Sequence, residues 1–444
     1  MADGRLHAAG LIIMAVAFGG GGINAALFNL VVQLAALFTL ALHPRAFIDF
    51  FRRAPRFPKI LIGLSLALPL LQSIPLPPAV WQALPGRDVA LETYRFTDQP
   101  DIWMALSQDL RRTLIAFLAL VPPLALVILT WDLPRAQQRQ LLLVLVGTGI
   151  AMVLLGAMQM ASGNRALMLF GDYAGPRYFG SSYLLGTFQN HNPACLFLVL
   201  TLNGLVGATP ARPSSRSVAG GSFAALILTM GIVTTGSRSG MAIAVLPFAL
   251  AAFGLLKAPV KRRLSLRVGI AGLAGLAGLA GGIGYVASNN ARIHSSIERF
   301  SNLQDDRSLI WADMEGAISR FWPVGSGIGT LDEVFQLDES LENLAPGRAA
   351  RAHNEYLEVA LESGLAGLAL LGAWIVFLSL RCMQSLRSSR LELAAATGLV
   401  ALAIQSISDF PLRFEAVLCA AGLLLALLVK APSQRRGERS GNET

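Results

Sequence analysis

Long runs of uncharged, apolar residues are the feature that most restricts how this 444-residue chain can fold. Several runs reach about 18 residues or more, which is the length a helix needs to cross about 30 Å of hydrocarbon. The runs are continuously apolar rather than alternating, so they favour helices over the strands of a barrel. The composition agrees, because 54% of the residues are hydrophobic and only 14% are charged. We therefore predict an all-α polytopic membrane protein.

The apolar runs predict about twelve membrane spans in a single membrane domain that covers residues 1–444 and ends in a short cytoplasmic tail, 430–444. The first run is expected to stay as an anchor, because no cleavage-site pattern follows it. The expected spans cover residues 8–22, 25–42, 58–75, 112–130, 140–160, 190–207, 220–235, 240–256, 268–286, 355–379, 393–408 and 412–429.

The basic residues predict the orientation. If the N-terminus is cytoplasmic, most of the 36 Lys and Arg residues lie in inner segments, and most of the 27 acidic residues lie outside or at outer helix ends. Positively charged loops stay on the cytoplasmic side, so we predict an inner-membrane protein with both termini inside. Basic loops that face anionic membrane lipids also account for the net charge of +9 without a nucleic-acid partner.

Two outer segments are long enough to do more than connect helices: residues 76–111 and a large periplasmic loop, 287–354. Loops of this length are uncommon unless they are functional or disordered. The large loop has apolar residues at helical spacing near Trp311, and a turn rich in glycine follows. We expect one or two short helices on the membrane surface there, with Trp311 and Trp322 near the headgroups.

The large loop ends in a cationic cluster, Arg348, Arg351, His353 and Asn354, at the outer mouth of the tenth expected span. In one interpretation, the arginines are interfacial anchors and His353 with Asn354 caps the helix. In the other, the arginines hold a pyrophosphate and His353 is a general base near neutral pH. Glu355 and Glu358 are rival candidates for the base.

Two further polar clusters lie on the same side of the membrane. Arg238 occupies a tight turn, Ser237 to Gly240, between the seventh and eighth expected spans. A charge so close to hydrocarbon is costly and usually faces a polar cavity or a partner, so we interpret Arg238 as functional. Asn192 and Pro193 lead into the sixth expected span and are, taken alone, a normal helix start. Together, the three clusters indicate a site on the outer face.

These motifs resemble the O-antigen ligase and polymerase superfamily of bacterial envelope glycosyltransferases. The turn Ser237-Arg238-Ser239-Gly240 is similar to the Ser-Arg-Gly-like turn of that family. His353-Asn354, nine residues, then Gly364 and Gly367 is similar to the end of its periplasmic loop. Arg307 followed by Trp311, the turn at 325–330 and the segment 186–192 also look like the family. The similar motifs lie between about residue 180 and residue 375, and the predicted arrangement of membrane spans resembles the family over the whole chain.

The resemblance implies a metal-independent transferase of the GT-C type, without a cofactor, that moves a glycan from undecaprenyl diphosphate to an acceptor hydroxyl on the periplasmic face. No Asp-X-Asp pair or His/Glu cluster suggests a metal, and the cysteines Cys195, Cys382 and Cys419 form no disulfide framework. The implied site has His353 as the base and Arg238 as a catalytic cation. The resemblance implies that the pyrophosphate is bound by Arg238, Arg348, Arg351 and Arg307. The implied supporting residues are Asn354, Asn192 and Ser237.

Besides a weaker option, a protein-directed oligosaccharyltransferase, three functions stay open at this point. The first is ligation, in which the acceptor is a sugar of the lipid A core, and the second is polymerisation, in which the acceptor is another carrier-linked glycan. The motifs do not separate them, because the two share the donor half of the site. A twelve-helix transporter is the third, but we find no internal repeat, and the polar residues gather at the outer ends rather than near the midplane.

Overall fold

A computed structural model describes residues 4–22, 25–162, 167, 183–210, 213–256, 307–340 and 351–429. The described chain is almost entirely helical, and its one sheet consists of two short antiparallel strands, β1 (Pro75–Leu76) and β2 (Met104–Ala105). The predicted all-α class is therefore confirmed.

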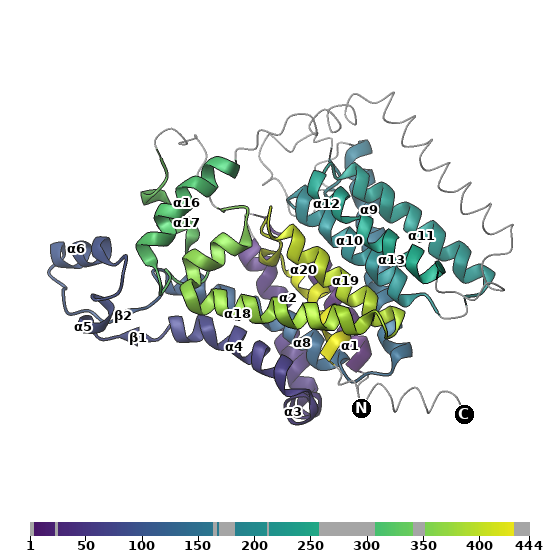
Figure 1. The fold of residues 1–444 in the computed structure, drawn as a ribbon, viewed down its shortest axis with the longest axis horizontal. Coiled ribbons are helices and arrows are strands. Elements are labelled where there is room, and N and C mark those ends of the chain that lie inside the picture. Colours follow the sequence, from purple (N-terminus) through teal and green to yellow (C-terminus); the bar gives the residue numbers. More distant parts are fainter. Residues whose placement is uncertain are drawn as a thin grey trace.

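Most helices form one bundle (Figure 1). They are α1 (Gly4–Phe18), α2 (Ala25–Leu42), α3 (Pro44–Arg53), α4 (Arg56–Gln72), α7 (Leu110–Leu118), α8 (Val121–Thr130), α9 (Arg135–Ser162), α10 (His191–Ala208), α11 (Ser215–Thr234), α12 (Arg238–Ile243), α13 (Val245–Leu256), α18 (Glu355–Ser385), α19 (Arg390–Gln405) and α20 (Glu415–Val429).

Six of the described helical segments are long and apolar enough to cross a membrane. The number is seven if α3 and α4, between which the chain bends by 119°, count as one span. Shorter apolar helices lie at Gly4–Phe18, Arg238–Phe253 and Glu415–Val429. Helices occupy every expected span except 268–286, which lies outside the described residues. The helix positions are thus confirmed, whereas the total of twelve spans and their orientation stay predictions.

The centre of the bundle is α10, which packs against α9, α11, α19 and α20. Its sequence is apolar around the whole circumference, as expected for a helix enclosed by other helices, and 83% of its span is buried. Gly207 allows the close approach of α19, because a Cβ there would lie 3.0 Å from Cβ of Ala394. The C-terminal end of α10 thereby packs closely against α19.

The two long outer segments pack together at one end of the bundle (Figure 1). The first contains β1, α5 (Pro78–Trp81), α6 (Asp88–Phe96) and β2, and the described part of the second contains α16 (Arg307–Phe321), α17 (Leu331–Val334) and the 3-10 helix η3 (Phe335–Leu337). The prediction of short helices in the large loop is confirmed. Their place at the membrane surface stays a prediction.

A buried arginine, Arg87, joins the two segments, and a partly exposed arginine of α7, Arg112, holds the second segment. Arg87 donates to the carbonyl oxygen of Leu106 at 2.5 Å and to that of Gly325 at 3.4 Å, and burial lowers its pKa to about 10. Arg112 forms ion pairs with Asp332 at 3.0 Å and Glu333 at 2.8 Å. These arginines hold the outer segments in place around the start of α18.

Candidate active site

The backbone of His353 adopts a conformation that is unusual for a residue other than glycine. Its φ is +52°, in the left-handed region that residues other than glycine seldom adopt. The next residue, Asn354, is the N-cap of α18, and its Oδ1 accepts hydrogen bonds from the amides of Tyr356 (3.0 Å) and Leu357 (3.2 Å). The capping interpretation is therefore correct for Asn354. His353 precedes the cap and projects from the chain before the helix begins.

The imidazole of His353 lies beside a buried carboxylate. Its Nδ1 is 3.5 Å from Oδ1 of Asp409, whose side chain is 1% exposed, whereas 30% of the His353 side chain is exposed. This separation is longer than a hydrogen bond of about 2.7–3.2 Å, and within the described residues Nδ1 has no hydrogen-bond partner. Phe410 meets the ring edge to face, with centroids 4.9 Å apart. A small movement of either side chain would bring Nδ1 of His353 and Oδ1 of Asp409 within hydrogen-bonding distance.

The turn that carries Arg238 is tied to the start of α10. Ser237 is the N-cap of α12, and its hydroxyl donates to Oδ1 of Asn192 at 2.7 Å. Arg238 is the first residue of α12. Asn192 lies one residue inside α10, whose N-cap is Asn190 rather than Asn192 itself. Two of the clusters found in the sequence are thus in direct contact.

The C-terminal end of α19 joins the Arg238 turn to the His353 segment. Gln405, its last residue, donates from Nε2 to the hydroxyl of Ser239 at 2.9 Å. The following carbonyl, that of Ser406, accepts a hydrogen bond from the amide of Glu355 at 2.9 Å. Asp409 follows in the segment 406–414 between α19 and α20, which we call the α19–α20 connection. All three clusters therefore meet at one helix end.

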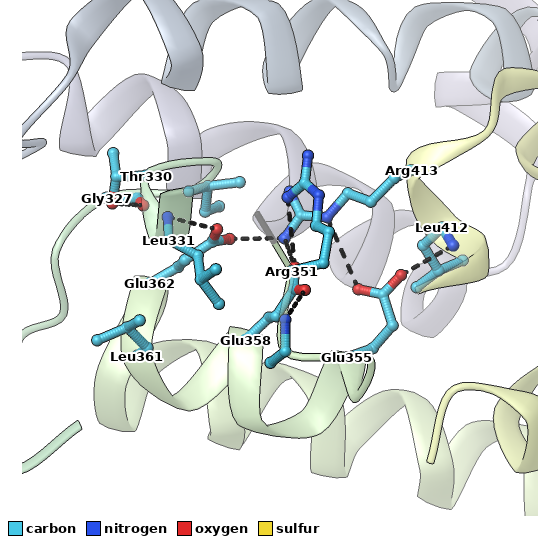
Figure 2. A network of polar contacts seen from close by, with 12 residues as sticks. Gly327, Thr330, Leu331, Arg351, Glu355, Glu358, Leu361, Glu362, Leu412 and Arg413 are labelled. Atoms are coloured by element: carbon cyan, nitrogen blue, oxygen red, sulfur yellow. Dashed lines mark hydrogen bonds and ion pairs between the residues drawn. The ribbon is translucent and has the colours of Figure 1, made fainter. Parts of the chain in front are cut away.

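Three glutamates on α18, Glu355, Glu358 and Glu362, share one buried face and meet Arg413 of the α19–α20 connection (Figure 2). The Nη2 atom of Arg413 lies 2.8 Å from Oε2 of Glu358 and 2.8 Å from Oε2 of Glu362, and Nε lies 3.9 Å from Glu355. Burial by itself would lower the pKa of Arg413, but the three carboxylates raise it well above its usual value. We call these four residues the Arg413 network.

Glu358 also holds the segment that leads to His353. Its Oε1 accepts the amide hydrogen of Ala352 at 3.1 Å, and its Oε2 lies 3.5 Å from Nη1 of Arg351 (Figure 2). Arg351 also lies over the ring of Phe410, 5.9 Å from its centroid. Much of the charge of Arg351, which we expected to face a pyrophosphate, is therefore balanced by protein. The rival bases Glu355 and Glu358 are engaged in ion pairs.

The structure thus brings together Arg238, Ser237, Asn192, Asn354 and His353. Arg351 lies next to this group and faces Glu358. Arg348 lies outside the described residues, and Arg307 begins α16 with its side chain outside the description.

Sequence reasoning missed the α19–α20 connection, which supplies Asp409, Phe410 and Arg413. Two expected spans extended over most of it, 393–408 and 412–429, and left only three residues between them. The sequence did contain a signal for Asp409 and Arg413, because ionisable residues close to an apolar span are often functional or paired.

One protein family matches part of the chain. Residues 223–372, about a third of the sequence, match the family model described as O-antigen ligase. The match contains Arg238, His353 and the glutamates of the Arg413 network, and it ends before the α19–α20 connection. No curated protein and no solved structure matches the chain.

Proposed function

We propose that this chain, a member of the O-antigen ligase and polymerase superfamily by its domain at 223–372, is a glycosyltransferase that acts on the periplasmic face of the bacterial inner membrane. Its donor is a polysaccharide linked to undecaprenyl diphosphate, and its acceptor is a hydroxyl of the lipid A core. The observation that supports this proposal is that the turn carrying Arg238 and the segment carrying the His353–Asp409 pair are both attached to the same end of α19.

In the proposed reaction, the acceptor hydroxyl oxygen attacks the anomeric carbon of the donor sugar. A carbon–oxygen bond forms there, and the bond from that carbon to the diphosphate oxygen breaks with both electrons leaving on the diphosphate. The hydroxyl proton passes to His353. No metal takes part in any of these steps.

His353 suits the role of general base because one ring nitrogen faces the protein and the other is left for substrate. With Nδ1 directed at Asp409, Nε2 on the far side of the ring accepts the proton. The buried carboxylate then orients the ring and stabilises the imidazolium that forms, as in other His–carboxylate pairs. A positioned base of this kind typically contributes about 10²–10⁴-fold in rate.

Arg238 stabilises the leaving group. Negative charge grows on the diphosphate as the bond breaks, and a fixed cation at the edge of the hydrocarbon acts there with little screening. The bond from Ser237 to Asn192 fixes the turn that carries it. Arg348 and Arg307 remain further candidates for the diphosphate. Arg351 stabilises the negative charge on the diphosphate less than Arg238 does, because Glu358 lies 3.5 Å from its Nη1.

The proposal is tested by the lipopolysaccharide banding of a deletion strain complemented with the wild type, His353→Ala, Arg238→Ala or the control Arg216→Ala, which removes an exposed arginine of α11. Ligation predicts core without polysaccharide in the deletion strain, with carrier-linked chains accumulating. Only the wild type and Arg216→Ala should restore attachment when all variants accumulate equally.

Two other banding patterns would revise the proposal. Core capped by one repeat unit would identify a polymerase of the same superfamily instead. Unchanged surface glycan in the deletion strain would contradict both activities.

A further inference from the structure

The short helix α3 has three faces that differ in chemistry. Ala46 and Phe50 face the protein, where Phe50 is fully buried and meets the ring of Trp131 edge to face, with centroids 5.7 Å apart. The next face is apolar and between 40% and 46% exposed, and it carries Phe47, Ile48 and Phe51. The remaining side carries only ionisable residues: Arg45, Asp49, Arg52 and Arg53. A helix with this distribution is suited to the surface of a bilayer, with its apolar side toward the hydrocarbon.

The position of α3 in the fold agrees with such a surface. α3 comes directly before α4, and β1 of the first outer segment follows the end of α4, so α3 and β1 lie at opposite ends of this helix (Figure 1). The chain bends by 119° between α3 and α4. If α4 crosses the bilayer, α3 therefore lies closer to the membrane plane than to the membrane normal. It is then at the membrane surface opposite the outer segments.

The chain around this bend is strongly basic. Residues 44–59 contain five Lys and Arg residues and one acidic residue, Asp49. Asp49 is engaged by Arg53, whose Nη2 atom lies 3.0 Å from its carboxylate and 3.5 Å from that of Asp132. The other basic residues of 44–59 therefore have no free carboxylate within this segment to balance their charge.

Two arginines at the bend keep an unbalanced charge. Arg52 lies in the last turn of α3 and Arg56 begins α4, and both are exposed. Neither forms an ion pair within the part of the chain that the structure describes. Lys59 secures the bend, because its Nζ donates to the carbonyl oxygen of Phe51 at 2.6 Å. Cations at the edge of the hydrocarbon usually have an anionic partner, so Arg52 and Arg56 call for one from outside the chain.

An apolar stripe continues from these arginines along α4. Phe57, Ile60 and Leu64 are each about half exposed, and their spacing of three and four residues places them on one side of the helix. Cations followed by apolar side chains match the order of phosphate and acyl chains in a phospholipid. We infer that the bend between α3 and α4 binds an anionic phospholipid, with its phosphate at Arg52 and Arg56. A zwitterionic headgroup fits less well, because its own cation would meet theirs.

Photolabelling of the full-length protein in phosphatidylcholine nanodiscs tests this inference. The probes are phosphatidylglycerol and phosphatidylcholine that carry the same diazirine-bearing acyl chain, and we expect phosphatidylglycerol to label α3 and α4 more strongly. Each basic residue beside an anionic lipid contributes about fivefold in binding, so Arg52→Gln with Arg56→Gln should lower this labelling about tenfold or more. Lysine at both positions keeps the charge and should retain most of the labelling.

A matched control removes two other exposed arginines, Arg216 in the first turn of α11 and Arg387 just after α18. Both lie at helix ends away from the candidate active site, because Arg238 follows the far end of α11 and His353 precedes the far end of α18. Arg216→Gln with Arg387→Gln changes the net charge by the same amount and should leave labelling of α3 and α4 unchanged.

Equal labelling of α3 and α4 by the two probes would overturn the inference, because the bend would then not select an anionic headgroup. An equal loss of labelling in the control double variant would also overturn it, since net charge alone would explain the effect. Labelling that disappears when inorganic phosphate is added at constant ionic strength would show that the two arginines hold a soluble anion instead of a lipid.

Discussion

The carboxylate of Glu358 accepts a hydrogen bond from the backbone amide of Ala352 at 3.1 Å, one residue before His353. The same side chain pairs with Arg413 at 2.8 Å. Glu358 therefore links the segment that carries His353 to the connection that supplies Asp409. Glu358, first considered as a rival base, thus supports the backbone next to His353, the residue that we propose as the base.

Replacement of Glu358 should slow transfer without changing donor binding. Glu358→Ala removes both bonds, so the left-handed conformation of His353 loses its support, and we expect kcat to fall at least tenfold with little change in KM. Glu358→Gln keeps an acceptor for Ala352 and should lose less. The measurement is steady-state transfer by purified protein, normalised to folded enzyme. Equal loss in both variants would show that the ion pair, not the amide bond, is what matters.

Asp409→Asn preserves the shape of the side chain but removes the charge that faces His353. We expect kcat to fall about 10–10²-fold, because an amide orients the imidazole less well and does not stabilise the imidazolium. Asp101→Asn, at an exposed position of the first outer segment, is the matched control. Asp101→Asn should keep the kcat of the wild type, whereas Asp409→Asn should not. Wild-type kinetics in that variant would remove Asp409 from the mechanism.

Arg413→Met should destabilise the protein. It leaves the carboxylates of Glu355, Glu358 and Glu362 buried without their main cation, and breaking a buried ion pair costs about 3–5 kcal/mol. Thermal unfolding in detergent should report a clear decrease in Tm. Adding Glu362→Gln should restore part of the loss, since one uncompensated charge is removed. A further decrease in the double variant would argue against charge imbalance as the cause.

Gly240 is required by the contact between α12 and α10. A Cβ at this position would overlap the sulfur of Cys195, so Gly240→Ala should destabilise the Arg238 turn by about 1–3 kcal/mol and reduce transfer. Cys195→Ala removes the sulfur, and the double variant should regain part of both losses. The test compares Tm and transfer rate across the four proteins. Additive losses would indicate that the two residues do not clash.

The structure places Arg112 against Asp332 and Glu333. Because its side chain is 35% exposed, these pairs should contribute only about 0–1 kcal/mol. We expect Arg112→Ala to increase limited proteolysis of the outer segments and to leave KM for the acceptor unchanged. A large rise in that KM would indicate that Arg112 also contacts the acceptor.

The sequence predicted the helices well because an apolar run of spanning length has few alternatives in a membrane. Arg238, Asn192 and His353 were found because each follows or precedes such a run. Asp409 and Arg413 escaped notice because their partners, His353 and Glu358, lie more than fifty positions earlier in the chain. Such pairings depend on how α18, α19 and α20 pack, which local pattern does not encode.

Gln405 and Ser406 attach the C-terminal end of α19 to the Arg238 turn on one side and to the start of α18 on the other. The groups that we propose for the leaving diphosphate and for the incoming hydroxyl thus share one support, and a displacement of this helix end would misalign both at once. The preference for an acceptor could therefore differ between related proteins only through segments that do not pack against α19. The outer segments at 76–111 and 307–340 provide such freedom.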